Sequence, residues 1–163
     1  SKNKSLLLRA FVTYVRPLLE YCSPVWSPHY QYLIDQIERV QRYFIKRIPG
    51  LWNVSYEKRL EICQIHSLEE RRTINDLILC YSILNNYVDT SLINSFNYND
   101  FVKTRGHDLR LYTRFCSNDH TKFFFSNRVA KLWNRLPDHV VHASSVFCFK
   151  KFLLNLDSNY FKC

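Results

Sequence analysis

Two stretches of the chain place apolar residues at steps of three and four, and this spacing constrains the fold more than any other feature. The apolar positions are Leu33, Ile37, Val40, Phe44 and Ile48 in the first stretch, and Ile74, Leu77, Ile78, Tyr81 and Leu84 in the second. Steps of this size bring side chains onto one face of an α-helix. The sequence therefore predicts two amphipathic helices, over residues 30–48 and 67–86.

Both predicted helices carry recognisable end signals. Pro49 and Gly50 follow the first helix and stop it, because proline cannot donate a backbone hydrogen bond. At the start of the second helix, Ser67 and Glu70 have the spacing of a capping box, in which each side chain accepts from the other residue's backbone amide. These signals make the two helices the best defined of the predicted elements.

The rest of the chain is also predicted to be mainly helical. Further helices are expected over Ser5–Tyr21 with an interruption at Pro17, over Ser55–Cys63, over Ser126–Leu136 and from Ser144 or Ser145 onward, with a short helical piece near Thr90–Asn94. Residues 107–125 alternate apolar and polar side chains, which predicts a two-stranded hairpin. The expected fold class is mainly α, a helical bundle with one small β-hairpin. The 2 glycines disfavour an all-β fold, which needs many tight turns.

Length and composition fit a folded domain. The 163 residues are 47% hydrophobic, which favours a packed core over disorder. We expect residues 1–86 to form one helical region and residues 87–163 to form an extension made of the hairpin and two helices. The two regions are expected to pack as one compact unit.

The chain is strongly basic, with a net charge of +9. The positive residues are spread along the sequence rather than gathered in a tail, so we expect a basic surface on a folded body. Such a surface is typical of proteins that bind polyanions, and nucleic acid is the expected partner. No apolar run approaches the ~20 residues of a membrane span, so a membrane partner is not expected.

The six cysteines do not suggest a disulfide framework. Cys63 and Cys80 lie among apolar residues of helical pattern, where a reduced thiol packs as a small apolar side chain. The sequence opens without a signal peptide. We therefore expect an intracellular protein that is not secreted, located in the nucleus or in a cytoplasmic ribonucleoprotein.

A row of cations on the first predicted helix is the leading candidate binding site. Arg39, Arg42 and Lys46 are three and four residues apart and so share one side of the helix, and Arg47 follows directly. Cations along a helix can contact the phosphates of a duplex without reading its sequence. The alternative is a solvated face that Asp35 and Glu38 partly neutralise.

A second basic candidate is Arg105, in the loop Lys103–His107. Gly106 can adopt a positive φ there at little cost, and the loop could present Arg105 to a nucleic-acid backbone. A plain turn that leads into the predicted hairpin explains the same residues equally well.

Other candidates have stronger structural explanations. Arg71 and Arg72 follow two glutamates, and at least one is expected to form an ion pair within the fold. Trp26, Trp52 and Trp133 could stack on bases, although the helical position of Trp133 favours the core.

The sequence offers little support for a catalytic or metal site. Cys63-x-x-His66 has zinc-like spacing, and Cys22 with His29 could complete four ligands, but a single Cys–His pair is a weak signal. No Gly-x-Ser-x-Gly motif marks a nucleophile. We therefore expect no catalytic residue, no bound metal and no cofactor in this chain.

Four blocks, in order, resemble the region that follows the catalytic palm in reverse transcriptases of LINE-type (non-LTR) retrotransposons. They are Arg16–His29, Ile37–Arg42 leading into Phe44, Leu60–Arg72, and Phe124–Pro137 followed by Val140-Val141 and Phe149-Lys150. The resemblance extends from about Ser5 to Asp157. It implies a thumb-like region at residues 1–86, a post-thumb extension at 87–163, and an RNA template–DNA primer duplex as the partner.

The resemblance also implies what this chain lacks. Such polymerases hold Mg²⁺ with an adjacent pair of aspartates, whereas the eight aspartates of this sequence include no adjacent pair. We therefore expect a fragment without catalysis of its own, whose palm and fingers are missing. The alternative is a helical protein-interaction module derived from such a polymerase. If the helix over Ser5–Tyr21 evolved to lie against the missing palm, its face with Leu6, Leu7 and Phe11 would be unusually open to solvent.

Overall fold

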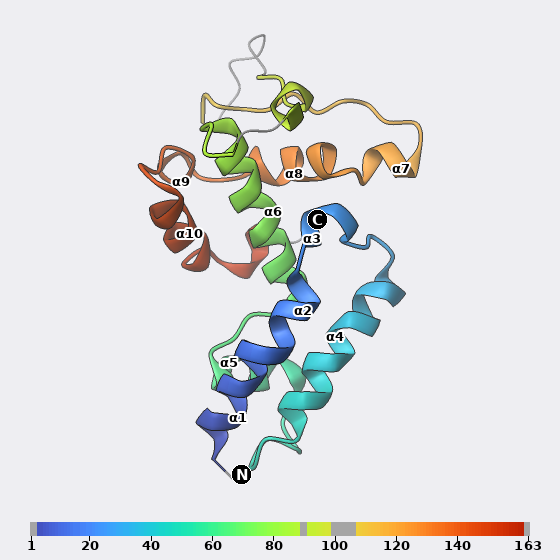
Figure 1. The fold of residues 1–163 in the computed structure, drawn as a ribbon, viewed down its shortest axis with the longest axis vertical. Helices are drawn as coiled ribbons and strands as arrows, with labels where there is room; N and C mark the ends of the chain where they lie inside the picture. The colour runs from blue at the N-terminus through green and yellow to red at the C-terminus, as the bar shows by residue number, and fades with distance from the viewer. Residues whose placement is uncertain (1–2, 89–90, 99–106, 162–163) are drawn as a thin grey trace. The chain divides into compact units, whose positions relative to one another are not determined.

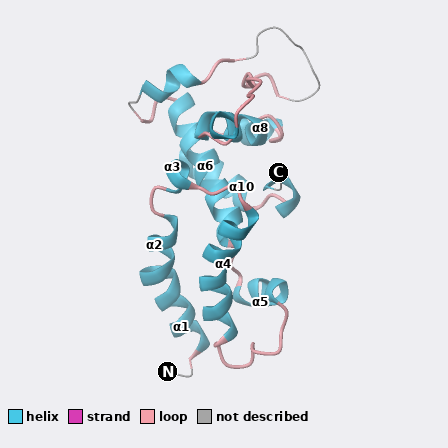
Figure 2. Ribbon diagram, turned by 90° about the vertical axis from the view of Figure 1, so that its right-hand side faces the viewer, coloured by secondary structure: helices cyan, strands magenta, loops and turns pink. Residues whose placement is uncertain are grey.

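The computed structural model describes residues 3–88, 91–98 and 107–161 (Figure 1). The predicted fold class, mainly α, is confirmed. The α-helices are α1 (Lys4–Ala10), α2 (Arg16–Glu20), α3 (Ser23–Trp26), α4 (Gln31–Lys46), α5 (Tyr56–Cys63), α6 (Leu68–Leu84), α7 (Asp119–Lys122), α8 (Phe125–Trp133), α9 (Asp138–Val141) and α10 (Val146–Leu154). A π-helical segment (Phe11–Val15) and two 3₁₀ segments (Ser91–Ser95 and Ser158–Phe161) complete the elements. Figure 2 shows no strand in these ranges.

The chain divides into two compact units, Ser1–Arg72 and Thr73–Cys163. The division falls inside α6, whereas the sequence placed it at residue 86. The physical reason is that α6 is one continuous helix whose first turn bonds to α4, while its later turns contribute to the core of the second unit. The assignment of thumb and post-thumb regions to these parts stays a prediction.

The helix predicted over Ser5–Tyr21 forms an almost continuous rod in three pieces, which lies beside α4 in the first unit (Figure 1). The side chain of Asn3 caps α1 by accepting from the amides of Ser5 and Leu6. A π-helical segment, Phe11–Val15, then leads to Pro17, whose missing N–H the wider turn accommodates. The expected interruption at Pro17 is thus a change of helix type.

Phe11 does not face solvent, contrary to the expectation for a helix that had lain against the missing palm. Its side chain is fully buried and its ring stacks on Phe44 of α4 at 4.7 Å between centroids. Leu6 is 53% exposed and Leu7 is half-buried. The N-terminal rod therefore uses Phe11 as its anchor on α4.

Helix α4 is turned by about one residue, roughly 100°, from the orientation that its apolar pattern predicts. Its buried positions are Ile34, Glu38, Gln41 and Ile45. Val40, which was predicted to face inward, is 40% exposed. Two polar side chains therefore occupy the middle of the buried face, and their hydrogen bonds decide the orientation of the helix.

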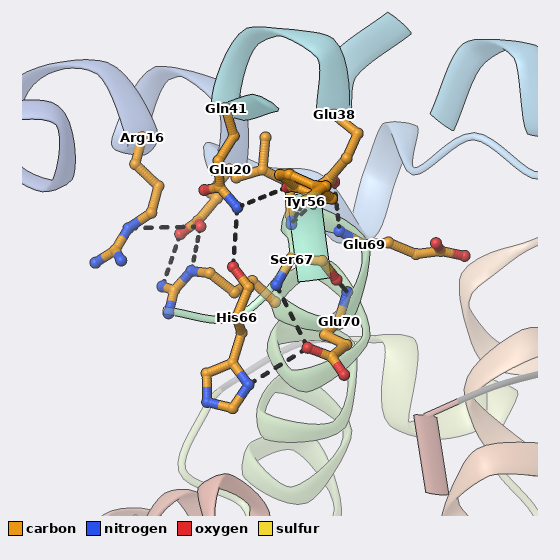
Figure 3. A network of polar contacts seen from close by, with 11 residues as sticks. Arg16, Glu20, Glu38, Gln41, Tyr56, His66, Ser67, Glu69 and Glu70 are labelled. Atoms are coloured by element: carbon orange, nitrogen blue, oxygen red, sulfur yellow. Dashed lines mark hydrogen bonds and ion pairs between the residues drawn. The ribbon is translucent and has the colours of Figure 1, made fainter. Parts of the chain in front are cut away.

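Glu38 is the centre of this polar contact (Figure 3). Its buried carboxylate accepts from the backbone amide of Leu68 at 3.0 and 3.1 Å and from that of Glu69 at 3.3 Å. The hydroxyl of Tyr56 also donates to Glu38. Because the amides at the start of a helix lack partners and carry a positive dipole end, a carboxylate there is strongly favoured.

Further contacts extend the network around Glu38 (Figure 3). The side-chain amide of Gln41 donates to the carbonyl of His66 at 3.0 Å and to the Tyr56 hydroxyl at 3.1 Å. Burial, and then the Glu38 carboxylate, raises the pKa of Tyr56, so this residue stays a neutral donor. The helices α4, α5 and α6 are thereby joined at one point of the first unit.

The predicted capping box at the start of α6 is confirmed. The Ser67 hydroxyl accepts from the Glu70 amide at 3.1 Å, and the Glu70 carboxylate accepts from the Ser67 amide at 3.4 Å. Ser55 caps α5 and Ser145 caps α10, close to where the sequence predicted these helices to start. Ser126 is not a cap: it is buried in the first turn of α8, which begins one residue earlier.

The second unit has its own apolar core, built around the later turns of α6, with α8, α9 and α10. Tyr81 of α6 stacks on Phe149 of α10 at 4.3 Å between centroids, and Trp133 of α8 is 1% exposed. Arg128 of α8 pairs with Asp76 of α6 through two hydrogen bonds of 2.8 and 3.0 Å. This two-pronged pair fixes α8 across α6.

The predicted hairpin over residues 107–125 is wrong. These residues contain one β-bridge contact, from Leu111 to Tyr98, and the helix α7. The side-chain amide of Asn134 both donates to the Leu111 carbonyl and accepts from its amide, each at 2.8 Å, and the Trp133 indole donates to the Leu109 carbonyl at 2.7 Å. Side chains at the end of α8 thus satisfy the backbone groups that a partner strand would have bonded.

His107 lies at the edge of the same core. Its Nε2 is 3.1 Å from the Trp133 carbonyl, and its ring meets the Trp133 ring edge-on. Burial lowers the pKa of His107; a weaker lowering comes from Arg110, and the Trp133 carbonyl acts in the opposite direction. The neutral imidazole is therefore the form that the fold accommodates.

Replacing Glu38 with glutamine should lower the free energy of unfolding by about 2 kcal/mol, because the charge that caps α6 is lost. Urea unfolding followed by far-UV circular dichroism would measure the change. Asp35→Asn is the matched control, since Asp35 is an exposed acid on the same helix and should change stability by less than about 0.5 kcal/mol. Equal losses in the two variants would contradict the capping role.

Acidification should destabilise the chain through His107. A histidine whose pKa is lowered by folding binds a proton more readily when unfolded, so stability falls as the pH drops below about 6.5, the unfolded value. The melting temperature should therefore fall between about pH 7.5 and 5.5, and less so in His107→Gln, whose amide can still donate to the Trp133 carbonyl. Parallel pH profiles for the two proteins would refute this role.

Candidate nucleic-acid interface

The four cations predicted on the first amphipathic helix lie together on the solvent side of α4. They are Arg39, Arg42, Lys46 and Arg47, all of them exposed, and are called the α4 cations below. At 100° per residue they lie within about 140° of one another around the helix, with Arg42 at the border of the buried face and the other three farther from it. The burial of Glu38 and Gln41 therefore has a second effect: it turns the α4 cations outward.

The charge of this face is not cancelled by neighbouring acids. No ion pair recorded among the described residues involves an α4 cation. Glu38, which the sequence offered as a neutralising charge, is 5% exposed and bonded to α6. Asp35 remains exposed on this side, where it accepts a weak 3.4 Å hydrogen bond from Gln31.

Two of the guanidinium groups are steadied by aromatic rings. The Arg42 guanidinium carbon lies 4.8 Å from the centre of the Tyr56 ring, and that of Arg47 lies 3.9 Å from the centre of the Tyr43 ring. Cation–π contacts of this kind hold an arginine in place and leave its N–H donors free for another acceptor. These two side chains are therefore already partly ordered in the free protein, so they lose less conformational entropy when a ligand binds.

The spacing of the α4 cations suits a nucleic-acid backbone. Seven residues separate Arg39 from Lys46, which corresponds to about 10.5 Å along the helix axis. A duplex carries one phosphate charge per about 1.7 Å of its axis when both strands are counted, so a stretch of this length contains about six phosphates. A helix laid along the duplex can therefore bring each cation near a phosphate without reading bases.

The other predicted cations fall elsewhere. Arg105 lies outside the described residues. Arg71 forms a two-pronged pair with Glu20 of α2, one bond of which is 2.9 Å, and Arg72 is 2% exposed. The structural explanation for these two arginines is therefore confirmed, and both are excluded from the interface.

Two exposed aromatic residues lie beside the α4 cations, without being part of that row. Tyr43 and Trp52 are 56% and 68% exposed, and both line a surface hollow of about 480 Å³ together with Lys46 and Arg47. The sequence marked Trp52 as a possible stacking residue but missed Tyr43. The missed signal is its place between Arg42 and Lys46, on the side of the helix that the cations define.

The remaining tryptophans differ from Trp52. Trp133 is part of the core, as predicted. Trp26 is 40% exposed, and its indole N–H donates to the carbonyl of Tyr21 at 2.7 Å, which fastens α3 to the preceding turn.

Cys63 and His66 both make contacts within the protein. Cys63 is 5% exposed within an apolar cluster, and burial raises the pKa of its thiol. His66 faces the Glu70 carboxylate, with Nδ1 at 3.4 Å. The cysteines within the described ranges are free thiols. These surroundings explain the pair without a metal.

An exposed group of three side chains lies in the second unit. His142 Nε2 is 2.9 Å from the Asp108 carboxylate and 3.5 Å from that of Asp138. Their ligand atoms lie within 4.8 Å of one another. Two acids that share one imidazole form an ordinary surface ion pair, and nothing else points to a metal at this position.

None of the helices in the described ranges has the length and apolarity to cross a bilayer.

Comparison with known proteins shows similarity to one uncharacterized protein and to no known family or solved structure. No protein-family profile matches the chain, and no solved structure matches it. The uncharacterized protein B0403.1 of Caenorhabditis elegans is 31% identical over 85 residues, which are 50% of this chain and 43% of that protein. The chain thus spans less than half the length of this relative, whose name states no activity.

Proposed function

We propose that the first unit binds nucleic-acid duplex through the α4 cations, by contacts with the phosphate backbone. The observation that carries this proposal is the outward-facing row of four exposed cations without an acid paired to any of them in the described structure. Exposed cations that no acid neutralises are available to a polyanion, and their arrangement along one helix matches a linear charge array.

The four-block resemblance gives this activity a context. We propose that the chain is the C-terminal, thumb-like part of a LINE-type reverse transcriptase, and that its duplex is RNA template paired with DNA primer. Such a protein would work in the nucleus or in a cytoplasmic ribonucleoprotein. Polymerisation and its Mg²⁺ would belong to the palm of the parent enzyme, since this chain has no adjacent pair of aspartates to hold the ions close together.

A second candidate function is protein interaction, and one surface favours it. Tyr14, Leu18, Tyr21 and Val25 are 74–84% exposed. The first three follow one another at steps of four and three along the N-terminal rod, and Val25 lies in α3, after the break in the helix at Cys22. A row of large apolar side chains open to water is typical of a surface that another protein covers. In the parent enzyme this partner would be the palm.

Binding of duplex should depend steeply on salt. Four phosphate contacts predict a slope of about −3.6 for log affinity against log salt, from roughly 0.9 per phosphate. Replacing Arg39, Arg42 and Lys46 with alanine should weaken binding equally for different duplex sequences and flatten the slope by about 2.7. Fluorescence anisotropy over a salt series would measure both quantities.

The same titration separates the two candidate functions. Leu18→Ser with Tyr21→Ser should leave duplex affinity within about twofold, because these side chains lie outside the α4 cations. Loss of affinity for only one duplex sequence in the alanine variant would contradict backbone binding. A slope near zero for the wild-type chain would favour the interaction module instead.

A further inference from the structure

The hollow beside the C-terminal end of α4 combines exposed rings with free cations. It is lined by Tyr43, Lys46, Arg47, Ile48, Pro49, Gly50 and Trp52. It is an open surface depression with a volume of about 480 Å³. Aromatic rings next to cations are the combination with which proteins hold single-stranded nucleic acid, because the ring stacks on a base while the cation meets its phosphate.

The turn that comes directly before Trp52 is anchored at both ends. Ile48 and Leu51 are 1% and 5% exposed and belong to one apolar cluster with Ile45 and Cys63. Between them Gly50 adopts a φ of +84°, a conformation that side chains disfavour. This short, anchored turn leads directly to Trp52, whose side chain is 68% exposed at the surface.

The ring of Tyr43 is also held in place. The Arg47 guanidinium lies 3.9 Å from its centre, while more than half of the side chain stays exposed. A third residue of the hollow, Lys46, is exposed and free of any ion pair in the described structure. The hollow therefore offers the exposed Trp52 indole for stacking, the Tyr43 ring with Arg47 on one of its faces, and two cations for phosphate.

We infer that this hollow binds an unpaired nucleotide of a single strand that continues from the duplex. The inference rests on the proposed function and adds to it: the α4 cations hold the paired backbone, and the hollow, reached through Lys46 and Arg47, takes the first unpaired base. The ligand class is single-stranded RNA or DNA next to a duplex end. Recognition is by stacking and charge, so it does not depend on base identity.

The test compares a short blunt duplex with the same duplex carrying a single-stranded extension. The wild-type chain should bind the extended form more tightly, by about five- to a hundredfold, the range expected from stacking one base. Trp52→Ala should abolish this gain and leave affinity for the blunt duplex unchanged. Trp52→Phe should keep most of the gain, because a phenyl ring can still stack.

Tyr32→Ala is the matched control. Tyr32 is 61% exposed on the same helix but lies outside the hollow, so its removal should leave the gain intact. A second readout needs no variant: 2-aminopurine as the first unpaired base should lose fluorescence when the wild-type chain binds, because it stacks on a ring.

The outcomes distinguish this inference from the proposal beneath it. Equal affinity for blunt and extended duplex, or unquenched 2-aminopurine, overturns the inference that the hollow binds an unpaired nucleotide. Neither result affects the proposal of duplex binding. An equal loss for both ligands in Trp52→Ala also overturns the inference about the hollow. The chain could also bind the single strand in a way that depends on salt and on Trp52, and not bind blunt duplex. This result overturns the duplex proposal and supports the assignment of the hollow. Binding of neither ligand overturns both.

Discussion

One buried carboxylate organises the first unit. Glu38 caps the start of α6 through the amides of Leu68 and Glu69 and receives the Tyr56 hydroxyl, so three helices meet at one side chain. A buried charge is tolerated only where donors surround it, and the free amides at a helix start supply them. The orientation of α4 follows from this contact. The outward position of the cations is its consequence on the opposite side of the helix.

The same carboxylate explains where the sequence pattern failed. Periodicity located α4 within a few residues, and the capping box located the start of α6. Apolar spacing alone, however, placed Val40 inside and offered Glu38 as a surface charge. A pattern that counts only apolar residues cannot anticipate that a helix end elsewhere in the chain will draw a glutamate into the interior. The correct rotation needed the tertiary contact.

The failed hairpin has a similar cause. Alternation over residues 107–125 is a local signal, but strands need partners for their backbone groups. Asn134 and Trp133, which are more than 20 residues away in sequence, bond the segment around Leu111 and make a partner strand unnecessary. For the candidate site, composition predicted the cations. It did not predict that Tyr43 and Trp52 would line one hollow, because their relation depends on the anchored turn at Gly50.

The central claim is that duplex lies along the solvent face of α4. Nuclear magnetic resonance of the uniformly ¹⁵N-labelled chain tests it most directly, by following backbone amide shifts as a duplex is added. The account predicts that the largest changes map to α4 between Asp35 and Arg47, with little change at Tyr14, Leu18 or Tyr21. Shifts concentrated on the apolar row of α1–α3, with α4 unchanged, would contradict it.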